Sequence, residues 1–262
     1  MHMRSLWTST TGMSAQNLNM DVIANNLANV STTGFKKSRA DFQDLLYQIM
    51  KVPGSPTSAD TRSPTGIQVG LGVKPAAVTK VFTEGDIVQT ENPLDVAIEG
   101  SGFFQVELPD GNTAYTRAGN LKLDGDGRLT TSDGFPLQPE IVIPEDAREV
   151  TISQNGLVSA LVGADTVSTE LGNIELADFV NEAGLIALGR NLFRETDSSG
   201  TATLGEPGSD GYGTLLQGYV ENSNVNLVEE MAHMITTQRA FEINSNVVST
   251  SDEMMQTTTN MV

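Results

Sequence analysis

The strongest constraint on this chain is a seven-residue repeat of apolar side chains at its C-terminal end. Six apolar residues keep this spacing up to the last position: Leu227, Met234, Phe241, Val248, Met255 and Val262. Met231 stands at the partner position of the repeat, and Asn226 is a suitable N-cap for a helix that begins at Leu227. A narrow apolar stripe at this spacing is typical of helices that pack against other helices. The pattern therefore predicts a long C-terminal helix.

The N-terminal end carries a similar repeat. Four apolar residues recur every seven positions, and four more residues fill the companion positions three later: Leu6, Met13, Met20 and Leu27, then Ser9, Gln16, Ile23 and Val30. This predicts a helix over about residues 3–29, with Gly34 as the stop signal after it. The first 40 residues hold four basic and one acidic side chain, whereas residues 221–262 hold one basic and six acidic ones. Opposite charge favours pairing of the two ends, although salt screens the effect.

Uncharged polar side chains cover the other faces of both predicted helices. The first helix carries five Asn residues there, and the second carries Ser, Thr and Asn, including Thr236, Thr237 and Asn244. A solvated helix face is usually rich in Glu and Lys instead. Such a face suits close packing against other subunits, or the lining of a wet and weakly charged channel.

Between the ends, the hydrophobic period shortens towards two, which indicates β-strands. Five short segments show it, separated by turn signals such as Asp124–Gly127: residues 96–98, 104–108, 121–123, 150–152 and 173–176. A Pro-rich stretch from Val52 to Thr65 precedes them. We therefore expect an α+β chain, with N- and C-terminal helices paired in a coiled-coil-like inner domain and an all-β antiparallel central domain. The expected boundaries are residues 1–35 and 225–262 for the helical assembly domain, 36–75 for an extended linker or bracing segment, and 76–224 for the β-rich outer domain.

The composition argues against several functional classes. With 15 basic and 33 acidic residues the net charge is -18, which opposes binding to nucleic acid or anionic lipid. There is no Cys, and the two His residues leave little material for a catalytic triad or a metal site. Asp124 and Asp126 invite a calcium interpretation, but Arg128 stands where an EF-hand needs an oxygen ligand. The sequence therefore predicts no enzyme, no cofactor and no metal, with no secretion signal and no membrane insertion.

Three blocks of sequence resemble the family of bacterial flagellar rod and hook proteins. The first is the run from Ala24 to Lys37, which contains the family's signature residues: Asn25, Asn26, Leu27, Ala28, Asn29, Thr33, Gly34 and Phe35. The second covers residues 92–104 and 115–120, which are similar to the family's central β-domain, and the third covers residues 217–242, which are similar to its C-terminal helix. Within the family, the chain is most similar to the distal rod proteins.

The resemblance implies a structural subunit of the flagellar basal body. Copies would polymerise into a hollow, rigid rod that crosses the periplasm, transmits torque to the hook and continues the export channel, after type III export without a cleaved signal peptide. The implied partners are further copies, proximal rod proteins, the hook protein, the peptidoglycan and outer-membrane ring proteins, and the export apparatus. Residues from about 47 to 75 correspond to the part that braces the rod. The repeat positions predict the assembly interface: Leu6, Met13, Met20, Ile23, Leu27, Leu227, Met231, Met234, Phe241, Val248 and Met255.

Three other interpretations remain open from the residues alone. A proximal rod or hook-type paralogue shares the same signature, and location in the basal body separates it. A peptidoglycan-acting enzyme could use two of the many carboxylates, since paired Asp or Glu side chains cleave glycosidic bonds, and cell-wall digestion separates it. A calcium-dependent adhesin would show a metal-induced thermal shift that Asp124→Ala or Asp126→Ala removes.

Overall fold

The structure is a computed structural model that describes residues 2–54, 63–163, 167–209 and 211–260. Val262, the last position of the apolar repeat, and most of the Val52–Thr65 stretch lie outside these residues. Two long helices stand at the ends of the described chain, and the strand pairings are antiparallel wherever their direction is established. The α+β prediction is confirmed. The chain divides into two compact units, which we call the helical unit (residues 1–28, 38–79 and 226–262) and the β-rich unit (residues 29–37 and 80–225).

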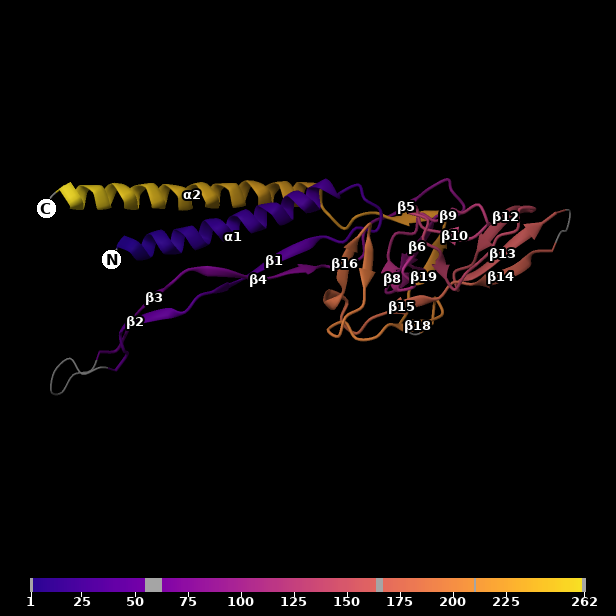
Figure 1. The fold of residues 1–262 in the computed structure, drawn as a ribbon, viewed down its shortest axis with the longest axis horizontal. Helices are drawn as coiled ribbons and strands as arrows, with labels where there is room; N and C mark the ends of the chain where they lie inside the picture. Colours follow the sequence, from indigo (N-terminus) through magenta and orange to yellow (C-terminus); the bar gives the residue numbers. More distant parts are fainter. Residues whose placement is uncertain (1, 55–62, 164–166, 210, 261–262) are drawn as a thin grey trace. The chain divides into compact units, whose positions relative to one another are not determined.

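The helical unit contains two helices and two narrow pairs of strands. Helix α1 (His2–Ala28) and helix α2 (Leu227–Asn260) lie side by side and run in opposite directions (Figure 1). Asn226 accepts hydrogen bonds through Oδ1 from the backbone N–H groups of Val228 (3.1 Å) and Glu229 (3.3 Å), so the predicted N-cap is confirmed.

Residues 38–80 form strands that the sequence pattern did not indicate. Strand β1 (Ser38–Asp44) pairs with β4 (Val73–Lys80), and β2 (Tyr47–Lys51) pairs with β3 (Ile67–Gly70). Most side chains in these two-stranded ribbons are exposed on both faces. A ribbon without one buried face lacks the alternation of apolar and polar residues that identifies a strand in a sequence.

The β-rich unit holds sixteen strands and a short 3₁₀ helix among the residues described. The strands are β5 (Ile87–Gln89), β6 (Val96–Glu99), β7 (Phe103–Glu107), β8 (Thr113–Thr116), β9 (Lys122–Leu123), β10 (Leu129–Thr130), β11 (Leu137–Gln138), β12 (Ala147–Ile152), β13 (Leu157–Val162), β14 (Thr169–Asn173), β15 (Leu176–Asp178), β16 (Ile186–Gly189), β17 (Leu192–Arg194), β18 (Thr203–Gly205), β19 (Thr214–Gln217) and β20 (Tyr219–Glu221), and the 3₁₀ helix is η1 (Glu182–Gly184). The largest sheet runs β16-β17-β8-β7-β15-β18, with β11 also paired to β7. Smaller sheets are β12-β13-β14, β19-β6, β20-β5 and β10-β9.

The central strands of the largest sheet, β7, β8 and β15, are mostly buried, whereas its edge strands β16 and β18 are mostly exposed. On β7, Phe104 and Val106 belong to a core of seventeen buried residues, whereas the neighbouring Phe103 belongs to a second core of six. Successive side chains of a strand point to opposite faces, so this strand contributes to both cores. Four of the predicted strand segments coincide with strands, but residues 173–176 do not form one strand. Instead, these residues connect the end of β14 to the start of β15, where the chain passes from one sheet to another. Ile174 is apolar because it is buried at this connection.

The first core should carry much of the stability of the β-rich unit. Leu176 is completely buried in it, so Leu176→Ala should cost about 2–5 kcal/mol through lost contacts and a residual cavity. The matched control is Leu123→Ala, because Leu123 lies in the same unit with 43% of its surface exposed, and its loss should stay within about 0.5 kcal/mol. Urea unfolding followed by circular dichroism measures both. Similar losses for the two variants would contradict the assigned core.

Candidate assembly surface

A polar seam joins α1 and α2 along their length. Four pairs of positions face one another, and the members of each helix are spaced by seven: Ser5 with Ser251, Gly12 with Asn244, Asn19 with Thr237, and Asn26 with Glu230. The hydroxyls of Ser5 and Ser251 lie 3.2 Å apart, and Asn19 Nδ2 donates to Thr237 Oγ1 over 3.0 Å. A Cβ on Gly12 would stand 3.1 Å from Asn244 Nδ2, so the helices approach closely there. The seam within one chain therefore uses small and polar side chains.

Asn26 connects three elements of the helical unit. Its side-chain amide donates to the carbonyl of Ser38 (2.9 Å) and accepts from the Ser38 N–H (2.8 Å), which closes a two-way bond to the start of β1. The same nitrogen lies 3.4 Å from Glu230 Oε2 on α2. Asn26 is only 2% exposed, so these bonds satisfy a polar group that burial would otherwise penalise.

The predicted apolar stripe lies largely beside this seam. Ile23 is buried, and most of the other predicted interface residues are half-buried: Leu6, Met13, Met20, Leu27, Met234, Phe241, Val248 and Met255. Leu227 and Met231 are exposed, at 46% and 50%. One chain therefore covers these residues incompletely.

Helix α2 exposes further apolar residues that the seven-residue repeat did not include. They are Val228, Ile235, Ile243, Val247 and Met254, with exposed fractions between 39% and 76%. Val228 and Ile235 occupy one position of the seven-residue repeat, Val247 and Met254 occupy another, and with Ile243 we call these five residues the second set. The sequence contained these residues, but only the structure shows that their side chains stay exposed in one copy.

Four signature residues lie at the start of the β-rich unit: Asn29, Thr33, Gly34 and Phe35. Gly34 has a φ of +69°, and it lies close to the backbone that connects β8 to β9. A Cβ at this position would lie 2.6 Å from the backbone nitrogen of Ala118. Its N–H donates to the carbonyl of Glu221 over 2.8 Å, and Thr33 accepts through its carbonyl from Asn191 Nδ2. Phe35 is buried, with the Lys80 ammonium 4.3 Å from its ring centre. Asn25 and Ala28 are exposed, while Asn29 is half-buried.

Three charged side chains meet in the interior of the same unit. Glu221 accepts from Lys36 Nζ at 2.6 Å through one oxygen and from Arg117 Nε at 3.0 Å through the other, and all three side chains are almost fully buried. Burial lowers the pKa of Lys36, the neighbouring Arg117 lowers it further, and Glu221 opposes both effects. Burial raises the pKa of the nearby Glu182 carboxyl, against the opposing charge of Arg117. Sequence reasoning did not find this cluster, because its members are far apart in the chain.

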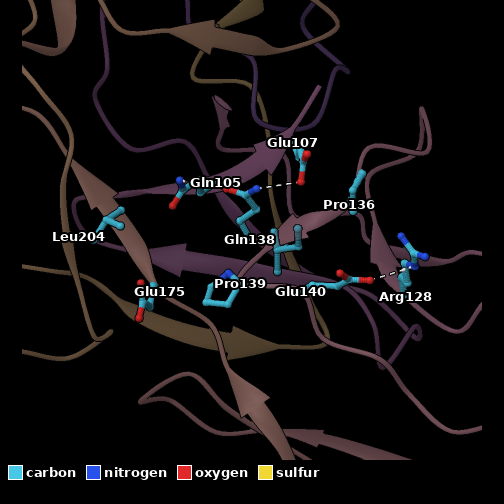
Figure 2. Close-up of a pocket in the computed structure, with 10 residues that line it drawn as sticks. Gln105, Glu107, Arg128, Pro136, Gln138, Pro139, Glu140, Glu175 and Leu204 are labelled. Atoms are coloured by element: carbon cyan, nitrogen blue, oxygen red, sulfur yellow. Dashed lines mark hydrogen bonds and ion pairs between the residues drawn. The ribbon is translucent and has the colours of Figure 1, made fainter. Parts of the chain in front are cut away.

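A polar pocket of 360 Å³ tests the enzymatic interpretation (Figure 2). Gln138 Nε2 donates to Glu107 Oε2 over 2.9 Å, and Arg128 forms an ion pair of 3.0 Å with Glu140. Three carboxylates line the pocket: Glu107 and Glu140 are exposed to solvent, and Glu175 is half-buried. None of them lies in the kind of buried, apolar site that holds a glycosidic general acid.

In the described parts of the chain, no group of three or more His, Cys, Asp or Glu side chains could hold a metal ion. Asp124 and Asp126 flank a hairpin turn between β9 and β10, in which Gly127 N–H donates to the Asp124 carbonyl. No helix in the same residues combines the length and apolar character that crossing a membrane requires.

Comparison with known proteins identifies the family. Three family models match: flagella basal body rod protein at residues 6–36, flagellar hook protein FlgE/F/G D1 domain at residues 97–160, and flagellar basal body rod FlgEFG protein C-terminal at residues 216–261. The flagellar basal-body rod protein FlgG of Buchnera aphidicola subsp. Acyrthosiphon pisum is 52% identical over 96% of this chain and 97% of its own length. The corresponding proteins of Caulobacter vibrioides and Borreliella burgdorferi are each 49% identical, over 99% of this chain and 99% and 98% of their own lengths.

The chain belongs to the FlgG family of flagellar basal-body rod proteins.

Members of the FlgG family are structural parts of the basal body and not enzymes. The three matched blocks fall on distinct parts of the fold. The first covers most of α1 and continues to Lys36, the second spans β6 to β13, and the third begins at β19 and runs along α2. The predicted resemblance to flagellar rod and hook proteins is confirmed.

Gly34 offers a test of the junction that the FlgG signature builds. Gly34→Ala should destabilise the β-rich unit more than Gly134→Ala, although both glycines have positive φ, at +69° and +84°. Each alanine should lose about 1–2 kcal/mol through its backbone conformation. At Gly34 the contact with Ala118 should add about 1–3 kcal/mol, because the backbone there must move, whereas nothing lies within 4 Å of a Cβ at Gly134. Urea midpoints measured side by side decide this, and equal losses would contradict the close approach.

Proposed function

We propose that this chain polymerises into the distal rod of the flagellar basal body, a hollow and rigid shaft that transmits torque to the hook. The observation that supports this most directly is that apolar side chains stay exposed along most of α2 in a single copy. Family membership supplies the setting, since the relatives are basal-body rod proteins. The physical argument for polymerisation rests on what one copy leaves uncovered.

The pairing of α1 and α2 supplies orientation more than stabilisation. Its four layers are Ser, Gly, Asn, Thr and Glu side chains, which bury little apolar surface. Burial of apolar area is the main favourable term when helices associate in water. The half-buried and exposed residues of the stripe, together with the second set on α2, are therefore available to helices of neighbouring copies. We propose that coiled-coil-like packing in this protein occurs between copies, through Leu227, Met231, Met234, Phe241, Val248 and Met255 on α2 and Leu6, Met13, Met20, Ile23 and Leu27 on α1.

The hollow shaft would also continue the export channel, as the family resemblance implies. Many hydroxyls of α2 donate to carbonyls of their own helix one turn earlier, as Thr236, Ser249, Thr250 and Thr257 do. These hydroxyls share repeat positions with exposed apolar residues such as Ile235 and Ile243. This face of α2 therefore suits close packing against other copies better than the lining of the channel.

We further propose that different segments of the chain form different layers of the rod. Residues 1–35 and 225–262 would form the inner tube, residues 76–224 its outer wall, and residues 36–75 the brace between neighbouring copies. The exposed apolar side chains of β2 and β3, such as Tyr47, Ile49 and Ile67, support a bracing contact. The proposed partners are further copies, the proximal rod proteins, the hook protein, the surrounding ring proteins and the type III export apparatus.

The location of the chain tests this function directly. Basal bodies isolated from cells that carry a tagged copy should show the tag in the rod between its proximal part and the hook when imaged by electron microscopy. Deletion of the gene should leave basal bodies without the distal rod and hook. A tag found in the proximal rod or in the hook would instead support a paralogue of the same family.

Polymerisation through α2 predicts a clear effect of charge at Ile243. Because this side chain is 63% exposed in one copy, Ile243→Asp should change the unfolding free energy of the monomer by less than about 0.5 kcal/mol. In the polymer the same carboxylate would be buried without a partner, which should prevent assembly. The matched control, Ile243→Met, keeps an apolar side chain and should assemble. Sedimentation of the purified chain and counts of complete basal bodies measure the result, and normal assembly of Ile243→Asp would contradict an interface at this position.

A further inference from the structure

The chain passes between its two compact units four times, and three of these passages end at bonded segments of the β-rich unit. The passages follow Ala28, Lys37, Thr79 and Val225. Three short segments of the β-rich unit therefore adjoin a passage: residues 29–37, the chain from Lys80 onward, and the chain that ends at Val225. All three segments are hydrogen-bonded to one another.

Backbone and amide bonds join these segments in a closed pattern. The Val81 N–H donates to the Lys37 carbonyl over 2.9 Å. The Lys37 N–H donates in turn to Asn224 Oδ1 over 2.7 Å. Asn224 Nδ2 then donates back to the carbonyls of Val81 (2.9 Å) and Thr83 (3.0 Å). One asparagine side chain thus bonds both other segments.

Buried charges reinforce the same place. Lys36 Nζ donates to Glu221 Oε1 (2.6 Å) and to the Thr83 carbonyl (2.8 Å), so one ammonium touches both other segments. Glu221 Oε1 also accepts from the Gly85 N–H over 2.9 Å, and its second oxygen binds Arg117 Nε. Lys80 Nζ donates to the Lys36 carbonyl over 2.9 Å. Glu221 therefore neutralises cations that burial has removed from water.

We propose that the junction cluster, defined as Lys36, Lys80, Arg117, Glu221 and Asn224, is a mechanical anchor that fixes the β-rich-unit ends of three passages, at Lys37, Lys80 and Val225, relative to one another. Force that enters this unit through any one of these passages is then shared among the bonded segments instead of pulling a single strand out of a sheet. The proposal rests on the proposed rod function for the origin of the force. The anchoring itself belongs to the single chain and is tested there.

Hydrogen exchange on the purified full-length chain tests the anchor. Glu221→Gln keeps the shape of the side chain but removes the carboxylate that forms ion pairs with Lys36 and Arg117. Peptides that cover residues 29–37 and 80–85 should then exchange at least about tenfold faster, because their local opening no longer breaks a buried ion pair. Peptides of β7 and β15 should keep their wild-type rates. The matched control is Glu140→Gln, which removes an ion pair between exposed side chains of the same unit and should change neither set.

Two results on the single chain would overturn the proposal. One is wild-type exchange of residues 29–37 in Glu221→Gln. The other is equal acceleration of those peptides and of β7, which would make Glu221 a general stabiliser of the fold. Asn224→Ala is a milder second variant if Glu221→Gln fails to fold. It removes the hydrogen bonds of the Asn224 amide, and every buried charge keeps its ion-pair partner. It should accelerate the same two segments, and an unchanged rate would again contradict the anchor.

Swimming under viscous load separates the anchor from the proposed function. Cells that carry Asn224→Ala should build complete basal bodies, and their speed should fall more steeply than that of wild-type cells as the viscosity of the medium rises. Equal speeds at every viscosity would overturn the mechanical role of the cluster. A distal rod that persists after deletion of the gene would overturn the rod function instead, whatever the exchange data show.

Discussion

The buried carboxylate of Glu221 makes the interactions that hold the β-rich unit together near its passages to the helical unit. Glu221 ends β20, and its two oxygens accept from Lys36, Gly85 and Arg117, three groups from separate parts of the sequence. Such a group is costly to bury unless every partner is present, so the site holds one arrangement and disfavours partial ones. The signature glycine, Gly34, lets the backbone pass close enough for its N–H to bond the Glu221 carbonyl. The charged cluster and the signature are therefore parts of the same construction.

The helical unit separates orientation from stabilisation. Polar and small side chains spaced by seven set the register of α1 against α2, while apolar side chains on other faces remain available. Polar residues at repeat positions specify register and partner at a cost in stability. Association with further copies would bury the apolar side chains that one copy leaves exposed. This agrees with the polymer that we propose.

The sequence predicted the parts whose signal is local. The long helices follow from side chains repeated at every turn, and Asn226 follows from the chemistry of an N-cap. Strands with one or two buried faces were predicted where apolar residues alternate or cluster, as at β6 and β7. The ribbons of residues 38–80 were not, because their side chains are exposed on both faces. Residues 173–176 were taken for a strand because Ile174 and Leu176 are apolar, although burial at a connection selects the same residues.

The sequence by itself determined the class of fold, the positions of both helices and the family, since these depend on periodicity and on contiguous motifs. Only the tertiary structure decided which helix faces meet. A repeat of seven exists for the polar set at Ser5 and Asn19 as well as for the apolar set at Leu6 and Met20, and the sequence does not say which one the partner helix covers. The tertiary structure also decided that Lys36, Arg117 and Glu221 meet. Their contact joins residues up to 185 positions apart, and no local pattern encodes a contact of that range.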